Sequence, residues 1–340
     1  MNSESELMET VKGIIEKRGR DAIEQARKEI LDSQYDSGAI SSALKYFARV
    51  TLKGGLPVFP ALISLSCEAV GGKTEKTTSI GAALTLIAGT ADIHDDIIDQ
   101  STVKYSKKTV LGKFGADVAL LAGDALLTQG LMLLHKECES LPKEQKETIL
   151  NLLFQAFIKI SQAEAAETKL MKRLDVPPEK YFEIIRMRAV VPELHCKIGA
   201  VLGNGDARAI EALGSYGRTF GITSTIREEF IDLLEYQELR NRLKNECPPL
   251  PFLLALQNSR IKTKVLSLLK NTLLCRNNFE EITKIILKSQ EVQSLRREMR
   301  FLTENNLSRL VLLENEKVRS ELIILLTASL EFWKKWKFDQ

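Results

Sequence analysis

The sequence lacks the features of a disulfide-stabilised or zinc-binding protein. Its five cysteines, Cys67, Cys138, Cys196, Cys247 and Cys275, are odd in number and form no Cys-x-x-Cys pair. This usage predicts reduced thiols in a cytoplasmic protein rather than a disulfide framework. The three histidines lie far apart without ligand spacing, so a histidine zinc site is not expected.

An excess of one charge and a long uncharged apolar run are also absent. The 48 Lys and Arg residues nearly balance the 45 Asp and Glu residues, so we expect no nucleic-acid or anionic-membrane partner. No uncharged apolar run reaches the roughly 18 residues that a transmembrane helix needs. The first six residues are polar and acidic, which does not fit a signal peptide.

Glycine and proline are scarce, and they fall mostly between long segments with apolar residues at three- and four-residue spacing. No sustained alternation of period two is present, so the sequence predicts an all-α protein with a single domain over 1–340. Pro178 and Gly71 are typical of a helix start and a helix end. Ser37 is likewise typical of the residue just before a helix, here the second one. The predicted helices are 3–32, 38–52, 57–70, 76–100, 108–114, 116–136, 143–171, 178–203, 207–221, 222–243, 250–258, 260–272, 279–288, 290–304 and 314–336.

The most informative stretch is Ala91-Asp92-Ile93-His94-Asp95-Asp96-Ile97-Ile98-Asp99, which places four aspartates in an otherwise apolar helix. Asp95 and Asp99 share one helical face, and Asp92 and Asp96 form a second pair beside them. Like charges this close need a cation, and carboxylate oxygens suit Mg²⁺, which shares its shell with substrate phosphates. The stretch therefore predicts a Mg²⁺ site; a solvated acidic face is the alternative.

A second acidic run is Arg227-Glu228-Glu229-Phe230-Ile231-Asp232, in which Glu228 and Asp232 share a helical face. By itself it is more typical of an ordinary helix surface than of a metal site. Asp124 lies in an apolar helix, where it is either a buried hydrogen-bond anchor or part of a site, and we favour the anchor. A lysine group follows the first acidic stretch, where a diphosphate would need cations. Its members are Lys104, Lys107, Lys108 and Lys113.

Together these features resemble the trans-isoprenyl diphosphate synthases, the polyprenyl synthetase family. The resemblance covers roughly residues 20–260 in order, and the helices of 260–336 are interpreted as scaffold. The matching segments are His94 to Asp99, Phe114-Gly115, Gly123 to Leu127, Tyr181 to Arg188, Tyr216 to Asp232 and Leu250-Pro251.

The resemblance implies a helical bundle around a central cavity, usually a homodimer, in which two acidic motifs hold Mg²⁺ ions on the diphosphate of an allylic substrate. By this resemblance, Asp95 and Asp99 are metal ligands and Asp96 supports them. Glu228 and Asp232 occupy the second motif, where the family normally has two aspartates followed by a third. Lys104 takes the place of an arginine that follows the first motif, and Arg188 takes the place of a lysine that contacts the allylic diphosphate.

The sequence departs from the family where isopentenyl diphosphate should bind. In place of Gly-Gly-Lys-Arg-x-Arg-Pro it reads Gly54-Gly55-Leu56-Pro57-Val58-Phe59-Pro60, without the three cations. Ala88 stands where the family has a histidine, Tyr105 where it has a second arginine, and Cys247 where it has a lysine. One preorganised charge-stabilising contact contributes about 10²–10³ in rate. The loss of several together should therefore leave little of the normal condensation with isopentenyl diphosphate.

Three interpretations follow. The chain is a Mg²⁺-dependent prenyltransferase whose second substrate is held by other cations such as Lys53, Lys104 or Lys107. Alternatively, it is a non-catalytic or regulatory subunit that pairs with a complete prenyl diphosphate synthase. A third alternative is a diphosphate-ionising, terpene cyclase-like enzyme that needs no isopentenyl diphosphate. If the chain elongates, the small Thr90 and Ala91 before the first motif predict a product longer than farnesyl.

Overall fold

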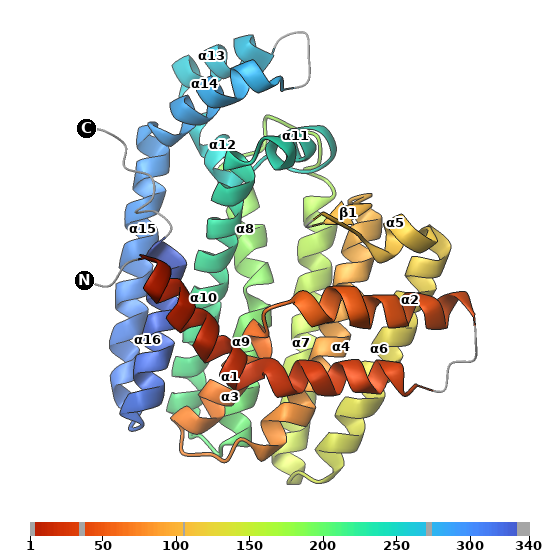
Figure 1. The fold of residues 1–340 in the computed structure, drawn as a ribbon. Helices are drawn as coiled ribbons and strands as arrows, with labels where there is room; N and C mark the ends of the chain where they lie inside the picture. Colours follow the sequence, from red (N-terminus) through yellow and green to blue (C-terminus); the bar gives the residue numbers. More distant parts are fainter. Residues whose placement is uncertain (1–3, 34–37, 105, 270–273, 332–340) are drawn as a thin grey trace. The chain divides into compact units, whose positions relative to one another are not determined.

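The computed structural model describes residues 4–33, 38–104, 106–269 and 274–331, and these residues are helical nearly throughout (Figure 1). The predicted all-α class is therefore confirmed. Ser37, Tyr105 and the predicted helical residues 332–336 lie outside the described residues. The chain divides into two compact units, which are considered separately below, and the prediction of one domain stays a prediction.

The first unit comprises 1–152, 195–211 and 313–321. Its first half contains two long helices, α4 and α6, with shorter elements between and before them. The elements that begin in this unit before residue 152 are α1 (Glu4–Leu31), α2 (Ala39–Phe47), the π-helix η1 (Ala48–Leu52), α3 (Val58–Ala69), α4 (Glu75–Ile98), β1 (Val103–Lys104), β2 (Lys107–Lys108), α5 (Val110–Phe114), α6 (Ala116–Glu139) and α7 (Lys143–Glu167).

The second unit comprises 153–194, 212–312 and 322–340. Helices α7, α9, α10 and α16 contribute residues to both units. The remaining elements are α8 (Pro178–Arg188), α9 (Val190–Leu202), α10 (Ala207–Leu234), α11 (Tyr236–Asn245), α12 (Leu250–Ala255), α13 (Ser259–Leu269), α14 (Arg276–Leu287), α15 (Gln290–Leu307), the 3₁₀ helix η2 (Ser308–Leu312) and α16 (Glu316–Glu331).

Helix α4 lies at the centre of the first unit and packs against α1, α3 and α6. Ile80, Leu86 and Ile93 are buried on it, so the apolar part of the acidic stretch anchors the helix in the core. Helices α4 and α6 run side by side in Figure 1. Gly123 permits their close approach, since a Cβ at this position would lie 2.5 Å from the Nε2 atom of His94.

Replacing Gly123 with alanine is expected to lower the stability of the protein by about 1–3 kcal/mol, because the added methyl group overpacks the α4–α6 contact. Thermal denaturation measures the effect. Gly13→Ala is the matched control, since Gly13 lies in α1 with nothing within 4 Å of an added Cβ, and it should be neutral or stabilising by about 0.5–1 kcal/mol. A Gly123→Ala protein as stable as the Gly13→Ala protein would contradict the close contact.

The core of the second unit is built on α8, α10 and α12. Tyr181, Ile226, Phe230 and Phe252 are almost fully buried in it. Ile226, Phe230 and Leu233 recur at three- and four-residue spacing on α10, which places one face of this helix in the core. The second acidic motif lies on the last turns of the same helix, so its residues differ in burial according to the face that they occupy.

Three of the differences from the sequence prediction have a clear physical reason. Residues 207–234 form one helix rather than two, because Gly221 is a packing contact instead of a break: a Cβ there would lie 2.6 Å from the Cγ atom of Pro192. The predicted helix 178–203 is interrupted at Ala189, where Pro192 cannot donate a helical hydrogen bond to residue 188. The hairpin β1–β2 is absent from the predicted elements, because two-residue strands are too short to show an alternation of period two.

Helix α6 is, among the described residues, the one helix whose length and composition would allow it to cross a membrane. One such helix is a weak indication, and α6 packs against α4 and α2 in the first unit. Leu120, Leu121 and Met132 are nevertheless exposed on α6. These three side chains are called the α6 apolar face below.

Candidate functional site

The first acidic motif occupies the C-terminal turns of α4. Asp95 is partly exposed and Asp96 is buried. Asp99 is the C-cap of the helix, and its backbone N–H donates to the carbonyl oxygen of Asp95 at 2.9 Å. The helix therefore presents Asp95 and Asp99 one turn apart, as the i, i+4 spacing predicted.

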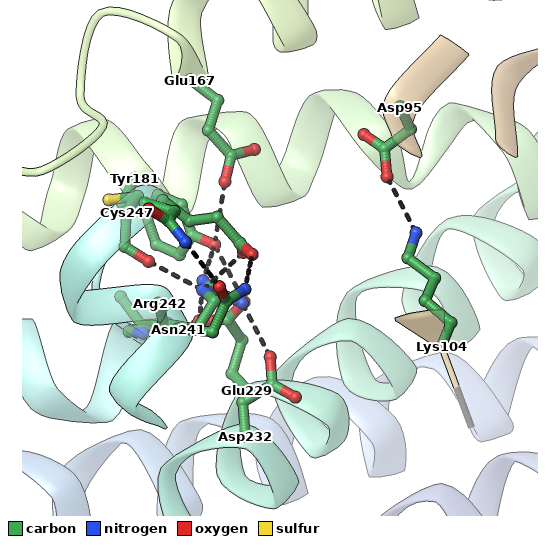
Figure 2. A network of polar contacts seen from close by, with 12 residues as sticks. Asp95, Lys104, Glu167, Tyr181, Glu229, Asp232, Asn241, Arg242 and Cys247 are labelled. Atoms are coloured by element: carbon green, nitrogen blue, oxygen red, sulfur yellow. Dashed lines mark hydrogen bonds and ion pairs between the residues drawn. The ribbon is translucent and has the colours of Figure 1, made fainter. Parts of the chain in front are cut away.

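Lys104 reaches this motif from the hairpin. The chain reverses at the end of α4 through Gln100, whose φ is +56°, and the backbone N–H of Ser101 donates to the carbonyl oxygen of Asp96 at 2.9 Å. The Nζ atom of Lys104 then lies 2.8 Å from Oδ1 of Asp96. It also lies 3.5 Å from Oδ2 of Asp95, the contact drawn in Figure 2. The side chain of Lys104 is still 43% exposed, so it can move to another anion without a burial cost.

The charges in this motif change one another's protonation. Desolvation and repulsion by Asp95 and Asp96 raise the pKa of Asp92 to about 6, against the attraction of Lys104. Burial alone would lower the pKa of Lys104, but its hydrogen bond to Asp96 and the nearby carboxylates raise it above its usual range. One lysine thus faces several carboxylates, and the remaining negative charge favours a further cation at the motif.

Asp124 is not the buried anchor that the sequence predicted. It is exposed on α6, and its Oδ1 lies 3.4 Å from Nε2 of His94 on α4. The hydroxyl of Thr90 donates to the carbonyl oxygen of Gly123 at 3.1 Å. The Gly123-Asp124 pair therefore fixes α6 against the turn of α4 that precedes the first acidic motif.

The segment Gly54 to Phe59 carries the apolar residues that replace the family's cations. Leu56 is exposed, and the ring of Phe59 stacks on His195 with 5.0 Å between centroids. Two cations come close from other elements. The Nζ atom of Lys107 lies 3.6 Å from where a Cβ of Gly54 would be, and Nη2 of Arg20 donates to the carbonyl oxygen of Gly55 at 3.1 Å.

In the second acidic motif, Glu228 and Glu229 point to different surroundings. The side chain of Glu228 is 58% exposed and lies 3.6 Å from Nη1 of Arg227. Glu229 is buried, and its Oε2 accepts the backbone N–H of Leu250 at 2.7 Å. Its Oε1 accepts the hydroxyl of Tyr181 at 2.9 Å. Glu229 therefore connects α10, α8 and the start of α12.

Arg242 of α11 inserts its guanidinium group into this motif, as Figure 2 shows. Its Nη1 donates to Oδ2 of Asp232 at 2.7 Å, and its Nη2 donates to Oε1 of Glu229 at 3.1 Å and to the hydroxyl of Tyr181 at 2.7 Å. Its Nε donates to the carbonyl oxygen of Cys247 at 2.8 Å and lies 3.3 Å from Oε2 of Glu246. The side chain is only 10% exposed. The second motif thus already contains a buried cation that belongs to the protein.

Arg188 is also paired within the second unit. Its Nε and Nη2 donate to the two carboxylate oxygens of Glu164 at 2.9 and 2.7 Å, and Nη2 lies 2.6 Å from Oε2 of Glu167. Burial raises the pKa of Glu167 to about 7, with Arg188 and Arg242 opposing and Glu229 adding to the effect. Burial raises the pKa of Asp232 to about 7 as well, against the charge of Arg242.

The raised pKa of Glu167 predicts a pH dependence of stability. The folded protein keeps the proton up to about pH 7, whereas the unfolded chain releases it near the ordinary value of 4.5. The folded state binds more protons between these values, so Glu167 lowers the free energy of unfolding as pH rises through this window. Glu167→Gln should therefore behave as the wild type near pH 4.5 and gain several degrees in Tm relative to it at pH 8.

Thermal denaturation at a series of pH values tests this expectation. Glu144→Gln is the matched control, because Glu144 is exposed on the same helix. A difference between Glu167→Gln and wild type that stays constant from pH 4.5 to 8 would show that Glu167 does not titrate differently in the folded state.

A family model for polyprenyl synthetases matches residues 40–286, more than half of the chain. The chain belongs to the polyprenyl synthetase family. A short chain isoprenyl diphosphate synthase of Methanothermobacter thermautotrophicus is 30% identical to it over 232 residues, which are 68% of this chain and 69% of that protein. A geranylgeranyl diphosphate synthase of Sulfolobus acidocaldarius is 26% identical, and the match covers 58% of this chain and 61% of that protein, less than two thirds of its length.

Solved structures of the family share the fold. The crystal structure of a geranylgeranyl pyrophosphate synthetase from Pyrococcus horikoshii superposes with a TM-score of 0.83 at 24% identity, over 95% of this chain and 98% of that one. The corresponding synthetase from Geoglobus acetivorans gives a TM-score of 0.80 at 21% identity, over 94% and 99% of the two chains. The resemblance to this family and the all-α fold that it implied are both confirmed.

The two acidic motifs differ in their fit to the Mg²⁺ that the family uses. Among the described residues, no group of three or more His, Cys, Asp or Glu side chains is close enough to hold a metal ion. Mg²⁺ does not need such a cage, because it binds one or two carboxylates and completes its shell with water and substrate phosphates. Asp95 and Asp99 on successive turns meet this requirement.

The second motif does not fit. Oδ2 of Asp232 is 2.7 Å from Nη1 of Arg242, Glu229 is buried in hydrogen bonds, and only Glu228 is exposed. A Mg²⁺ ion about 5 Å from a guanidinium group would be repelled by about 7 kcal/mol at an effective dielectric constant of about 20. The structure therefore brings together Asp95, Asp96 and Lys104 at one motif, and pairs Asp232 and Arg188 with charges of the protein itself.

The sequence analysis assigned no role to four residues that form the ion pairs around Arg188 and the second motif: Glu164, Glu167, Glu229 and Arg242. Glu229 carried a readable signal, because it lies on the apolar face of α10 three residues after Ile226 and four before Leu233. A carboxylate on such a face needs a buried partner. Arg242 carried no such signal, since it lies in a helix with other basic residues whose exposure the sequence does not distinguish.

Proposed function

We propose that this protein is a Mg²⁺-dependent prenyltransferase that joins an allylic prenyl diphosphate to isopentenyl diphosphate. The observation that carries the proposal is the first acidic motif, with Asp95 and Asp99 one helical turn apart and an exposed Lys104 next to them. Its relatives include a short chain isoprenyl diphosphate synthase and geranylgeranyl diphosphate synthases. A cytoplasmic location remains part of this proposal.

The bond to be broken is the allylic C–O bond, whose electron pair leaves with the diphosphate. Mg²⁺ bound to Asp95 and Asp99 would supply electrostatic stabilisation of the negative charge on the diphosphate. Lys104 would exchange its contacts with Asp95 and Asp96 for the departing diphosphate. The double bond of isopentenyl diphosphate would then form the new C–C bond, and loss of a proton would restore the alkene.

Isopentenyl diphosphate would have to bind without the family's usual cations. Lys107 next to Gly54 and Arg20 next to Gly55 are the closest replacements, together with Lys53 and Lys104. Arg20 already makes a bidentate pair with Glu16, so Lys107 is the better candidate. Weak binding of this substrate follows from replacing three cations with exposed or shared ones.

A second candidate function is that of a non-catalytic or regulatory subunit that pairs with a complete prenyl diphosphate synthase. The internal pairing of Arg188 with Glu164 and Glu167 favours it, since this residue is the one that the resemblance assigns to the allylic diphosphate. The α6 apolar face offers a surface for either a homodimer or such a heteromer. A third candidate is a terpene cyclase-like reaction that needs no isopentenyl diphosphate. It is consistent with the apolar Leu56 and Phe59 at the place where the family binds that substrate.

One set of assays separates the three functions. The purified chain is incubated with Mg²⁺, an allylic diphosphate and isopentenyl diphosphate, alone and then with the complete synthase of the same organism. Elongated product from the chain alone supports the prenyltransferase. No product alone, with a changed rate or product length in the mixture, supports the subunit. Diphosphate released without isopentenyl diphosphate supports the cyclase-like enzyme.

The product is expected to be longer than farnesyl. Ala91 lies four residues before Asp95 on the same helical face and is exposed, and its methyl side chain is too small to block a growing prenyl chain. Thr90 instead hydrogen-bonds to α6. Ala91→Phe should therefore shorten the product, as measured by chromatography of the dephosphorylated alcohols. Farnesyl or shorter products from the wild type would contradict the prediction.

A further inference from the structure

We infer that Arg242 is the resident cation of the second acidic motif and that the chain therefore binds divalent metal at the first acidic motif only. This inference rests on the proposed function for the first motif. It assigns to Arg242 a positioning role at the second motif, in place of an exchangeable metal ion.

Arg242 forms ion pairs with three carboxylates. Asp232, Glu229 and Glu246 surround the guanidinium group with distances of 2.7, 3.1 and 3.3 Å. The hydroxyl of Tyr181 and the carbonyl oxygen of Cys247 accept from it at 2.7 and 2.8 Å. A guanidinium group has five N–H donors in a fixed plane, so this arrangement uses its geometry as well as its charge.

The surroundings also hold these acceptors in place. Oε1 of Glu246 accepts from Asn241 at 2.6 Å, and Glu229 is held by Tyr181 and by the backbone N–H of Leu250. Because the carboxylates cannot turn away without losing these bonds, they are positioned for Arg242 rather than for the octahedral shell that Mg²⁺ demands.

The contrast with the first motif is one of burial and chemistry. The side chain of Lys104 is 43% exposed, whereas that of Arg242 is 10% exposed. A lysine on a flexible stem can leave its carboxylates when a metal ion and a diphosphate arrive. A buried guanidinium group cannot leave without leaving the carboxylate of Glu229 buried and without a compensating positive charge. The first motif is thus open to exchange, and the second is closed.

The test is Mn²⁺ binding to the full chain in the presence of inorganic pyrophosphate, measured by electron paramagnetic resonance of free Mn²⁺. Asp232→Asn in the otherwise wild-type chain should leave the amount of bound Mn²⁺ unchanged and its Kd within about twofold. Arg242→Gln should gain a Mn²⁺ site that the double variant Arg242→Gln with Asp232→Asn lacks. Arg242→Lys, which keeps the charge, should gain no site.

Loss of bound Mn²⁺ in the Asp232→Asn protein would overturn the inference, and so would an Arg242→Gln protein that folds and gains no site. If Arg242→Gln does not fold, as judged by circular dichroism, the Asp232→Asn measurement decides. Wild-type Mn²⁺ binding that Asp95→Asn does not weaken would also overturn the inference, because the metal would then lie outside the first motif. The failure of the proposed function is seen separately in the prenyl-transfer assay, where a chain that gives no product can still bind Mn²⁺ through Asp95.

Discussion

Asp95→Asn is expected to reduce the release of diphosphate from an allylic substrate by at least about 10²-fold. The change removes the charge of a carboxylate that lies 3.5 Å from Nζ of the exposed Lys104 while keeping the shape of the side chain. A preorganised group that stabilises developing charge contributes about 10²–10³ in rate. Steady-state release of diphosphate, measured in the chain alone and with a partner synthase, gives the size of the loss.

The matched control is Asp21→Asn, which removes the charge of an exposed aspartate on α1 in the same unit. It should leave the rate within about twofold of wild type. Equal rates for Asp95→Asn and Asp21→Asn would show that the first acidic motif does not act on the diphosphate. The same result would remove the observation on which the proposed function depends.

Arg242→Ala is expected to destabilise the protein by about 3–5 kcal/mol. Removing one member of a buried ion-pair network leaves the others as buried charges without compensation, and here Glu229 and Asp232 would lose their shared partner. A loss of this size lowers Tm by about 6–20 °C, because about 1 kcal/mol corresponds to about 2–4 °C in domains of 150–250 residues. Differential scanning calorimetry of the wild type and the variant measures it.

Arg240→Ala serves as the control, because Arg240 is exposed on the same helix two residues away. An exposed arginine should change Tm by a degree or two at most, in line with the small effects of surface substitutions. If both alanine variants melt with the wild type, the guanidinium group of Arg242 does not stabilise the second unit. Arg242 would then be a peripheral residue rather than the centre of the network.

Much of the first motif could be predicted from the sequence because its geometry is local. Asp95 and Asp99 are neighbours on the helix surface wherever the helix lies, so their spacing was sufficient. Lys104 was also within reach, since it follows Asp99 by five residues and the chain reverses at Gln100. Its contact with both Asp96 and Asp95 depends on the hairpin, which cannot be predicted from the sequence because each strand has only two residues.

The sequence by itself determined the all-α fold, the family and the carboxylate pair of the first motif, because helical periodicity and i, i+4 spacing depend on residues close together in the chain. Only the tertiary structure decided the state of the second motif. Arg242 belongs to a different helix from the acidic residues of this motif that it contacts: it lies 10 residues from Asp232 and 13 from Glu229, and 61 residues from Tyr181. Which charge meets which depends on how the helices pack, and that packing places a guanidinium group where the resemblance to the family suggested a metal ion.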